Sequence, residues 1–163
     1  MKRLIIALLF FFSFNSFAQD TTTYYFIRHA EKDRTDPSDT NPKLTSKGRQ
    51  RAVKWSEVFQ EVSFDAVYST DYSRTIETAL PTTNAKNLKL IKYDADAGYS
   101  LQFQEQTQGK TVLIVGHSNT IPQFVNAVLN EERYPQIEDN DNSNLYIVTL
   151  LADKVNSVLL KIE

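Results

Sequence analysis

The sequence predicts an α/β fold, a three-layer sandwich with a mostly parallel central sheet. Short apolar runs alternate with helical patterns along the chain, which is typical of a parallel sheet covered on both faces. Two of the runs end in a histidine motif, Arg28-His29 and Gly116-His117, and these are the only two histidines of the chain. Because open α/β sheets bind ligands at the carboxyl ends of their strands, we expect both histidines at one binding edge.

The first 18 residues have the pattern of a secretory signal peptide. Basic Lys2 and Arg3 precede an apolar stretch over residues 4–12, which is too short to cross a bilayer, and the segment ends in the small residue Ala18. We expect cleavage after Ala18 and export to the periplasm or the medium, with no stable membrane insertion afterwards. An uncleaved anchor is the alternative. Residues 19–163 then form a single domain, since no repeat or linker divides them.

Charge and cysteine content narrow the possible partners and chemistry. The leader contains two of the 18 Lys and Arg and none of the 20 Asp and Glu, so its removal leaves 16 against 20 and changes the formal charge from -2 to -4. A mildly acidic net charge argues against a nucleic-acid or anionic-membrane partner, since such a partner favours a basic face. The absence of cysteine excludes disulfides, thiol catalysis and cysteine-ligated metal.

The first strand and helix follow the leader. Residues 24–27 predict a strand, and residues 30–42 predict a polar loop with two prolines and without the spacing of a calcium site. Thr45 is the expected N-cap of the next helix, which carries a core-facing stripe at helical spacing. The stripe consists of Gly48, Ala52, Trp55 and Phe59.

A second strand and helix are predicted over residues 64–69 and 71–80. We expect the buried face of this helix to consist of Tyr72, Ile76, Ala79 and Leu80. Arg74 lies off that face in the first turn, where the positive end of the helix dipole disfavours a cation unless an anion is nearby.

The remaining elements continue the alternation and then close the chain with strands. They are a strand over 88–91, a polar helix with a weak pattern over 98–108, a strand over 111–115, a helix from about Thr120, a hairpin-like turn over 138–144, and strands over 145–151 and 155–162. Pro122 suits the first turn of the helix from Thr120, whose apolar positions are Phe124, Val125, Val128 and Leu129. The acid-amide turn over 138–144 lacks the glycine and distal glutamate of a calcium loop.

Convergence of the two histidines with Arg28 and Arg74 would create a site for a phosphoryl group. Two guanidiniums can hold its oxygens by paired hydrogen bonds, and the helix near Thr120 would add backbone donors. A neutral imidazole can then attack phosphorus in line, and water can later cleave the phosphohistidine. The arginines supply the positive charge, so we expect no metal or other cofactor.

Four motifs in order resemble the histidine phosphatase superfamily, which has the phosphoglycerate mutase-like fold. They are Arg28-His29-Ala30-Glu31, Leu44-Thr45-x-x-Gly48, Ser69 with Arg74 and Thr78-Ala79, and Gly116-His117-Ser118-Asn119-Thr120. The resemblance covers residues 24 to about 129. It implies a metal-independent phosphatase that acts on a phosphorylated small molecule or phosphoprotein, with His29 as the phosphoryl acceptor. The residues that would bind the phosphoryl group are Arg28, Arg74, His117 and Asn119.

The resemblance leaves the general acid open. In one branch of the family the acid directly follows the second histidine, but this chain has Ser118 there. The candidates elsewhere are Glu31, Asp94, Asp96 and Glu105. A substrate with a good leaving group, such as phosphohistidine or an acyl phosphate, needs no strong acid, because general acid help is commonly worth about 10²–10⁴-fold.

The sequence is also compatible with functions other than a phosphatase. A phosphate-binding relative without catalysis and a phosphomutase remain open alternatives. An α/β-hydrolase with Ser118 as nucleophile fails, because its catalytic histidine would have to follow the serine and none does. A zinc hydrolase is disfavoured, since the histidines lack metal-ligand spacing and two arginines would repel the ion. The sequence specifies neither the substrate nor the oligomeric state.

Overall fold

The computed structural model describes residues 21–163. The predicted signal peptide over residues 1–18 and its cleavage site lie outside the described residues. Among residues 21–163, none of the helices combines the length and the apolar character that a membrane span requires.

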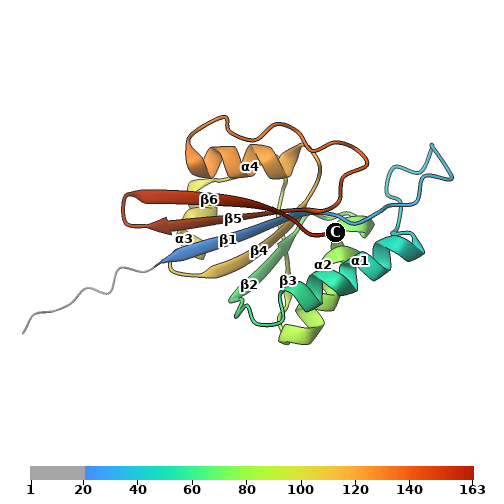
Figure 1. Ribbon diagram of the computed structural model, residues 1–163, viewed down its shortest axis with the longest axis horizontal. Helices are drawn as coiled ribbons and strands as arrows, with labels where there is room; N and C mark the ends of the chain where they lie inside the picture. The colour runs from blue at the N-terminus through green and yellow to red at the C-terminus, as the bar shows by residue number, and fades with distance from the viewer. Residues whose placement is uncertain (1–20) are drawn as a thin grey trace, which may run out of the picture.

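The described chain forms one six-stranded sheet in the order β3-β2-β4-β1-β5-β6 (Figure 1). The strands are β1 (Thr22–Arg28), β2 (Ala66–Ser69), β3 (Leu90–Lys92), β4 (Thr111–Gly116), β5 (Asn144–Leu151) and β6 (Lys154–Lys161). The first four in spatial order are parallel, whereas β5 runs antiparallel to β1 and β6 antiparallel to β5. The predicted three-layer α/β sandwich with a mostly parallel sheet is therefore confirmed.

Helices cover both faces of the sheet. Helices α1 (Ser46–Val58) and α2 (Ser73–Lys86) pack on one face, and α3 (Leu101–Thr107) and α4 (Thr120–Leu129) lie on the other (Figure 1). Side chains of β1 alternate between the two cores, as the period of a strand requires. Phe26 packs with the α3 and α4 side chains, whereas Ile27 packs with Trp55 of α1. Burial of each such side chain stabilises the fold by about 1.5–3 kcal/mol.

The start of α1 matches the prediction. The Thr45 side chain accepts a hydrogen bond from the Gly48 amide at 3.0 Å and so caps the helix. The members of the predicted stripe, Gly48, Ala52, Trp55 and Phe59, are all buried. The Thr45 amide also donates to the Glu31 carbonyl oxygen, which fixes the helix against the loop after β1.

Helix α2 differs from the prediction in length and in its buried face. It continues past residue 80, through Pro81, to a left-handed cap at Asn87. Tyr72 and Leu80 are 41% and 40% exposed, so the predicted apolar face is wrong for them. The buried residues are instead Thr75, Thr78, Ala79, Thr82 and Thr83.

Small threonines can form this face because local carbonyl groups accept hydrogen bonds from several of their hydroxyls. Thr78 donates to the Arg74 carbonyl oxygen at 2.7 Å, and Thr83 donates to that of Leu80 at 2.9 Å. A polar side chain satisfied in this way loses much of its desolvation cost, so it can be buried at a close helix contact.

Three further segments differ in detail. Strand β3 begins at Leu90, two residues later than predicted, and α3 spans only Leu101–Thr107. The predicted hairpin-like turn over 138–144 is instead part of the long connection from α4 to β5. The hairpin turn of this region lies at residues 152–153, between β5 and β6.

Replacement of Gly48 by alanine should destabilise the protein, although alanine normally stabilises a helix relative to glycine by about 0.5–1 kcal/mol. A Cβ at this position would overlap the Glu31 carbonyl oxygen. We expect a loss of about 1–3 kcal/mol in the free energy of unfolding, measured with urea. Lys54→Ala on the exposed side of α1 should change it by less than about 0.5 kcal/mol. A Gly48→Ala protein as stable as the wild type would contradict the close contact.

Candidate functional site

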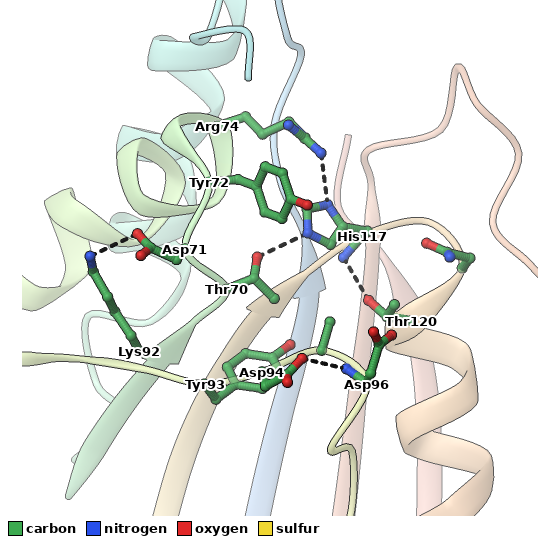
Figure 2. A pocket seen from close by; sticks show the side chains of 12 residues that line it. Thr70, Asp71, Tyr72, Arg74, Lys92, Tyr93, Asp94, Asp96, His117 and Thr120 are labelled. Atoms are coloured by element: carbon green, nitrogen blue, oxygen red, sulfur yellow. Dashed lines mark hydrogen bonds and ion pairs between the residues drawn. The ribbon is translucent and has the colours of Figure 1, made fainter. Parts of the chain in front are cut away.

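A cavity of about 660 Å³ opens at the carboxyl edge of the sheet (Figure 2). The segments after β2, β3 and β4 line it together with the start of α2 and the N-terminus of α4. The positive end of the α4 dipole lies at this cavity, as the sequence suggested for the helix near Thr120. This edge is where parallel α/β sheets bind their ligands.

The register of two neighbouring strands brings the histidines together. Arg28 of β1 pairs with Gly116 of β4, so the next residue of each strand is a histidine at the same edge. The His29 amide donates to the Gly116 carbonyl oxygen at 2.9 Å, which extends the ladder by one step. The centres of the His29 and His117 rings are 5.6 Å apart.

His29 is held in one tautomer. Its Nδ1 lies 2.7 Å from the Ala30 carbonyl oxygen, which can only accept, so Nδ1 carries the proton and Nε2 keeps its lone pair. Burial, together with the smaller effects of the charges of Arg28 and Arg74, lowers the pKa of His29 to about 3 against the opposing effect of the Ala30 hydrogen bond. The imidazole is therefore neutral at physiological pH, as a nucleophile must be.

His117 is oriented by a chain of hydroxyl groups. The Thr70 hydroxyl donates to the Thr75 hydroxyl and therefore accepts from His117 Nε2 at 2.9 Å (Figure 2). Nδ1 of His117 is then the ring nitrogen with the lone pair, and it lies 3.5 Å from Nη2 of Arg74. Burial, followed by the charges of Arg74, Arg28 and Lys32, lowers the pKa of His117 to about 4.

Arg74 offers buried hydrogen-bond donors that an anion could use. Its Nε and Nη1 atoms are buried and have no hydrogen-bond partner among residues 21–163. The guanidinium carbon lies 4.4 Å from the centre of the Tyr72 ring, which fixes the side chain beside His117 (Figure 2). Burial lowers the pKa of Arg74, but a guanidinium stays charged in proteins. Buried charged donors without partners are costly, so this arrangement favours a bound oxyanion.

Arg28 contributes less to the cavity than the sequence suggested. Its side chain is only 2% exposed, and Nη1 donates to the carbonyl oxygens of Glu138 and Asp141 at 2.8 and 2.9 Å. Nη2 donates to the Asp139 carboxylate at 3.0 Å, which leaves Nε as the buried donor without a partner among the described residues. The guanidinium therefore anchors the 138–141 loop, and its two Nη atoms are engaged there, whereas the sequence suggested that both arginines would offer paired donors to an anion. Arg28 retains Nε as one donor.

Of the other predicted residues, some line the cavity and some do not. Asn119, Asp94 and Asp96 line it, and both aspartates are exposed. The carboxylate of Glu31 instead forms ion pairs with Arg51 at 3.0 Å and Lys47 at 3.6 Å. Glu105 lines a different cavity, formed with residues such as Tyr24, Tyr99 and Leu150.

Three residues near the site were not among the site residues predicted from the sequence. Thr70 follows β2 directly, so the rule that polar residues at strand ends meet at one edge could have found it. Tyr72 was assigned to the core but lines the cavity wall. Lys32 places a third positive charge close enough to lower the pKa of His117, and no sequence pattern indicated it.

No metal site competes with this interpretation within the part of the chain that the structure describes. Among residues 21–163, no three His, Asp or Glu side chains are grouped so that they could hold an ion. The positive charge at the described site comes from Arg74, Arg28 and Lys32.

Comparisons with known proteins agree with this geometry. The family model of the histidine phosphatase superfamily (branch 1) matches residues 24–96. No curated protein matches the sequence. Among solved structures, the protein histidine phosphatase SixA complexed with tungstate has a TM-score of 0.69 at 17% identity, over 85% of this chain and 96% of that one.

Two further structures are similar over most of their length. Phosphoglycerate mutase from Bacillus anthracis has a TM-score of 0.67 at 13% identity, over 87% of this chain and 93% of that one. A mycobacterial glucosyl-3-phosphoglycerate phosphatase has a TM-score of 0.64 at 13% identity, over 87% and 98%. At such low sequence identities, the similarity shows a shared fold alone.

Because both histidine pKa values are low in the folded protein, its stability should fall as the solution becomes mildly acidic. Above the unfolded pKa of 6.5 neither state binds the proton, whereas at lower pH only the unfolded chain takes it up until the folded values, about 3 and about 4, are reached. The free energy of unfolding should therefore decrease between pH 6.5 and pH 4.5. The slope should approach about 1.4 kcal/mol per pH unit for buried His29, and be smaller for the more exposed His117.

The check is urea unfolding across this range for the wild type and His29→Gln. Aspartates such as Asp139 have lowered pKa values in the folded protein. Their protonation therefore reduces stability only around and below their ordinary pKa of 3.8, outside the pH range of this test. We expect a shallower pH dependence in the variant. An unchanged slope would show that His29 titrates normally in the folded protein.

Proposed function

We propose that the chain is a member of the histidine phosphatase superfamily, whose family model matches residues 24–96, and that it hydrolyses a phosphomonoester, or a phosphohistidine or acyl phosphate, through a phosphohistidine on His29. One observation carries the proposal. The buried donors of Arg74 that lack partners lie beside two neutral imidazoles whose rings are 5.6 Å apart. This combination offers an oxyanion site at the cavity and a candidate nucleophile next to it, since His29 does not itself line the cavity but lies beside His117, which does.

In the first step, Nε2 of His29 attacks phosphorus while the bond from phosphorus to the leaving oxygen breaks on the opposite side. The Ala30 carbonyl holds Nδ1–H during this step and stabilises the imidazolium that forms. Nε and Nη1 of Arg74 donate to the equatorial oxygens, where charge accumulates in the transition state. Nε of Arg28 adds one further donor.

His117 changes its protonation when the substrate binds. Without an anion it is neutral, because burial and the neighbouring cations hold its pKa near 4. A phosphoryl dianion next to Nδ1 opposes these cations and raises that pKa. His117 then takes up a proton on Nδ1 and donates it in a hydrogen bond to a phosphoryl oxygen, while Thr70 continues to hold Nε2.

Asp94 and Asp96 are the carboxyl groups that we propose for protonation of the leaving group. They line the cavity, whereas Glu31 is ion-paired and Glu105 lines another cavity. One of the two would donate a proton to the leaving oxygen and, in the second step, accept a proton from the water that cleaves the phosphohistidine.

Among the similar structures, one phosphatase is complexed with tungstate, an oxyanion, and a second is named as a phosphatase of a sugar-linked phosphoglycerate.

Removal of the nucleophile should abolish turnover without unfolding the protein. With 4-nitrophenyl phosphate, His29→Ala should lower kcat by at least about 10³-fold, since no other group can form the covalent intermediate. Arg74→Lys keeps the charge but loses the Nε and Nη1 donors, so kcat should fall by about 10²-fold. Arg133→Lys, on an exposed arginine paired with Glu131 away from the cavity, should leave kcat unchanged.

The same assay separates the open alternatives. Phosphate binding without release by the wild type would indicate a binding protein, and transfer of the phosphoryl group to a second hydroxyl would indicate a mutase. Chelator should not inhibit, because guanidinium groups supply the positive charge. Full activity of His29→Ala would overturn the proposal.

A further inference from the structure

The cavity is divided by charge. Arg74 lies on one side of His117, and the carboxylates of Asp94 and Asp96 lie on the other (Figure 2). Asp71 also lines the outer part, where it forms an ion pair with Lys92 at 2.7 Å. Among the described residues no ion pair engages Asp94 or Asp96. The outer half therefore carries negative charge that its own lining does not neutralise.

The separation of positive and negative charge within the cavity determines the orientation in which a phosphorylated ligand can bind. A phosphoryl dianion next to Asp94 and Asp96 would be repelled, whereas the donors of Arg74 that lack partners attract it to the inner half. The buried imidazole of His29 lies next to His117, with the ring centres 5.6 Å apart. The leaving group must then extend outward, past Thr120 and toward the two aspartates (Figure 2).

The geometry points to a substrate whose leaving group carries a positive charge. We propose, on the basis of the function above, that the substrate is a small phosphomonoester with an ammonium or quaternary ammonium group, as in a phosphorylated amino alcohol. The phosphoryl group binds at Arg74 and the cation lies between Asp94 and Asp96. Both ends of the ligand belong to one cavity of about 660 Å³, which is the size range of small-molecule sites.

The expected preference is moderate, because the two aspartates are exposed. Exposed ion pairs are worth about 0.2–1 kcal/mol each, so two of them give a factor of roughly 2 to 30. We expect about tenfold in kcat/KM for a cationic substrate over its neutral isostere. Because the pairs are exposed, the preference should shrink as the ionic strength is raised.

The test compares three substrates of similar size: phosphocholine, its neutral isostere 3,3-dimethylbutyl phosphate, and the anionic 2-carboxyethyl phosphate. The wild type should prefer them in that order. In Asp94→Asn/Asp96→Asn, the ratio of phosphocholine to the neutral isostere should fall from about ten to about one or two. Loss of a general acid cannot produce this fall, because it slows the neutral isostere, whose leaving group is the more basic, at least as much as phosphocholine.

Asp153→Asn is the matched control. It removes one carboxylate charge, against two in the double variant, from the turn between β5 and β6 at the opposite edge of the sheet (Figure 1), and should leave the ratio unchanged. Turnover of all three substrates with a wild-type ratio near one would overturn the inference while leaving the phosphatase intact.

Two other outcomes also count against the inference. A preference that survives in the double variant would show that other groups hold the cation. Faster turnover of a basic phosphopeptide than of phosphocholine would assign the carboxylates to a peptide substrate instead. Absence of turnover with every substrate, 4-nitrophenyl phosphate included, would refute the proposed function itself.

Discussion

The site depends on the parallel pairing of β1 with β4. Opposite residues in this ladder are Arg28 and Gly116, so a shift of one residue would turn the histidine side chains to different faces of the sheet. The apolar runs before both motifs fix the register, because Phe26 and Ile27 are buried in different cores. Packing far from the cavity thus sets the spacing of the two imidazoles.

Burial and positive charge then determine the state of the site without a ligand. Both histidines are neutral, because desolvation and the arginines disfavour a further cation. Arg74 is one of these cations, and its buried Nε and Nη1 donors have no partner among the described residues. Such a cost is tolerated at binding sites, where a ligand can supply the missing hydrogen bonds. Under the proposed function, affinity for an anion and the neutral state of His29 therefore have one physical origin.

Much of this could be predicted from the sequence, and the exceptions have physical reasons. The N-cap Thr45 and the buried stripe of α1 follow from local rules, and the two histidines at strand ends follow from topology. The threonine face of α2 was missed, because hydroxyls satisfied by nearby carbonyls look polar in a sequence but pack like small apolar groups. The orientation of Arg28 depends on backbone carbonyls more than one hundred residues away, which no local pattern contains.

That long-range anchor sets the order in which the site can be completed during synthesis. Residues 24–96, which the family model matches, contain His29 and Arg74. His117 comes later, and the carbonyl groups that hold Arg28 and the Asn142 amide that donates to the His29 carbonyl oxygen at 2.8 Å come later still. A nascent chain that ends before residue 142 therefore holds His29 and Arg74 without these supports, and the arrangement is complete only after that point of synthesis.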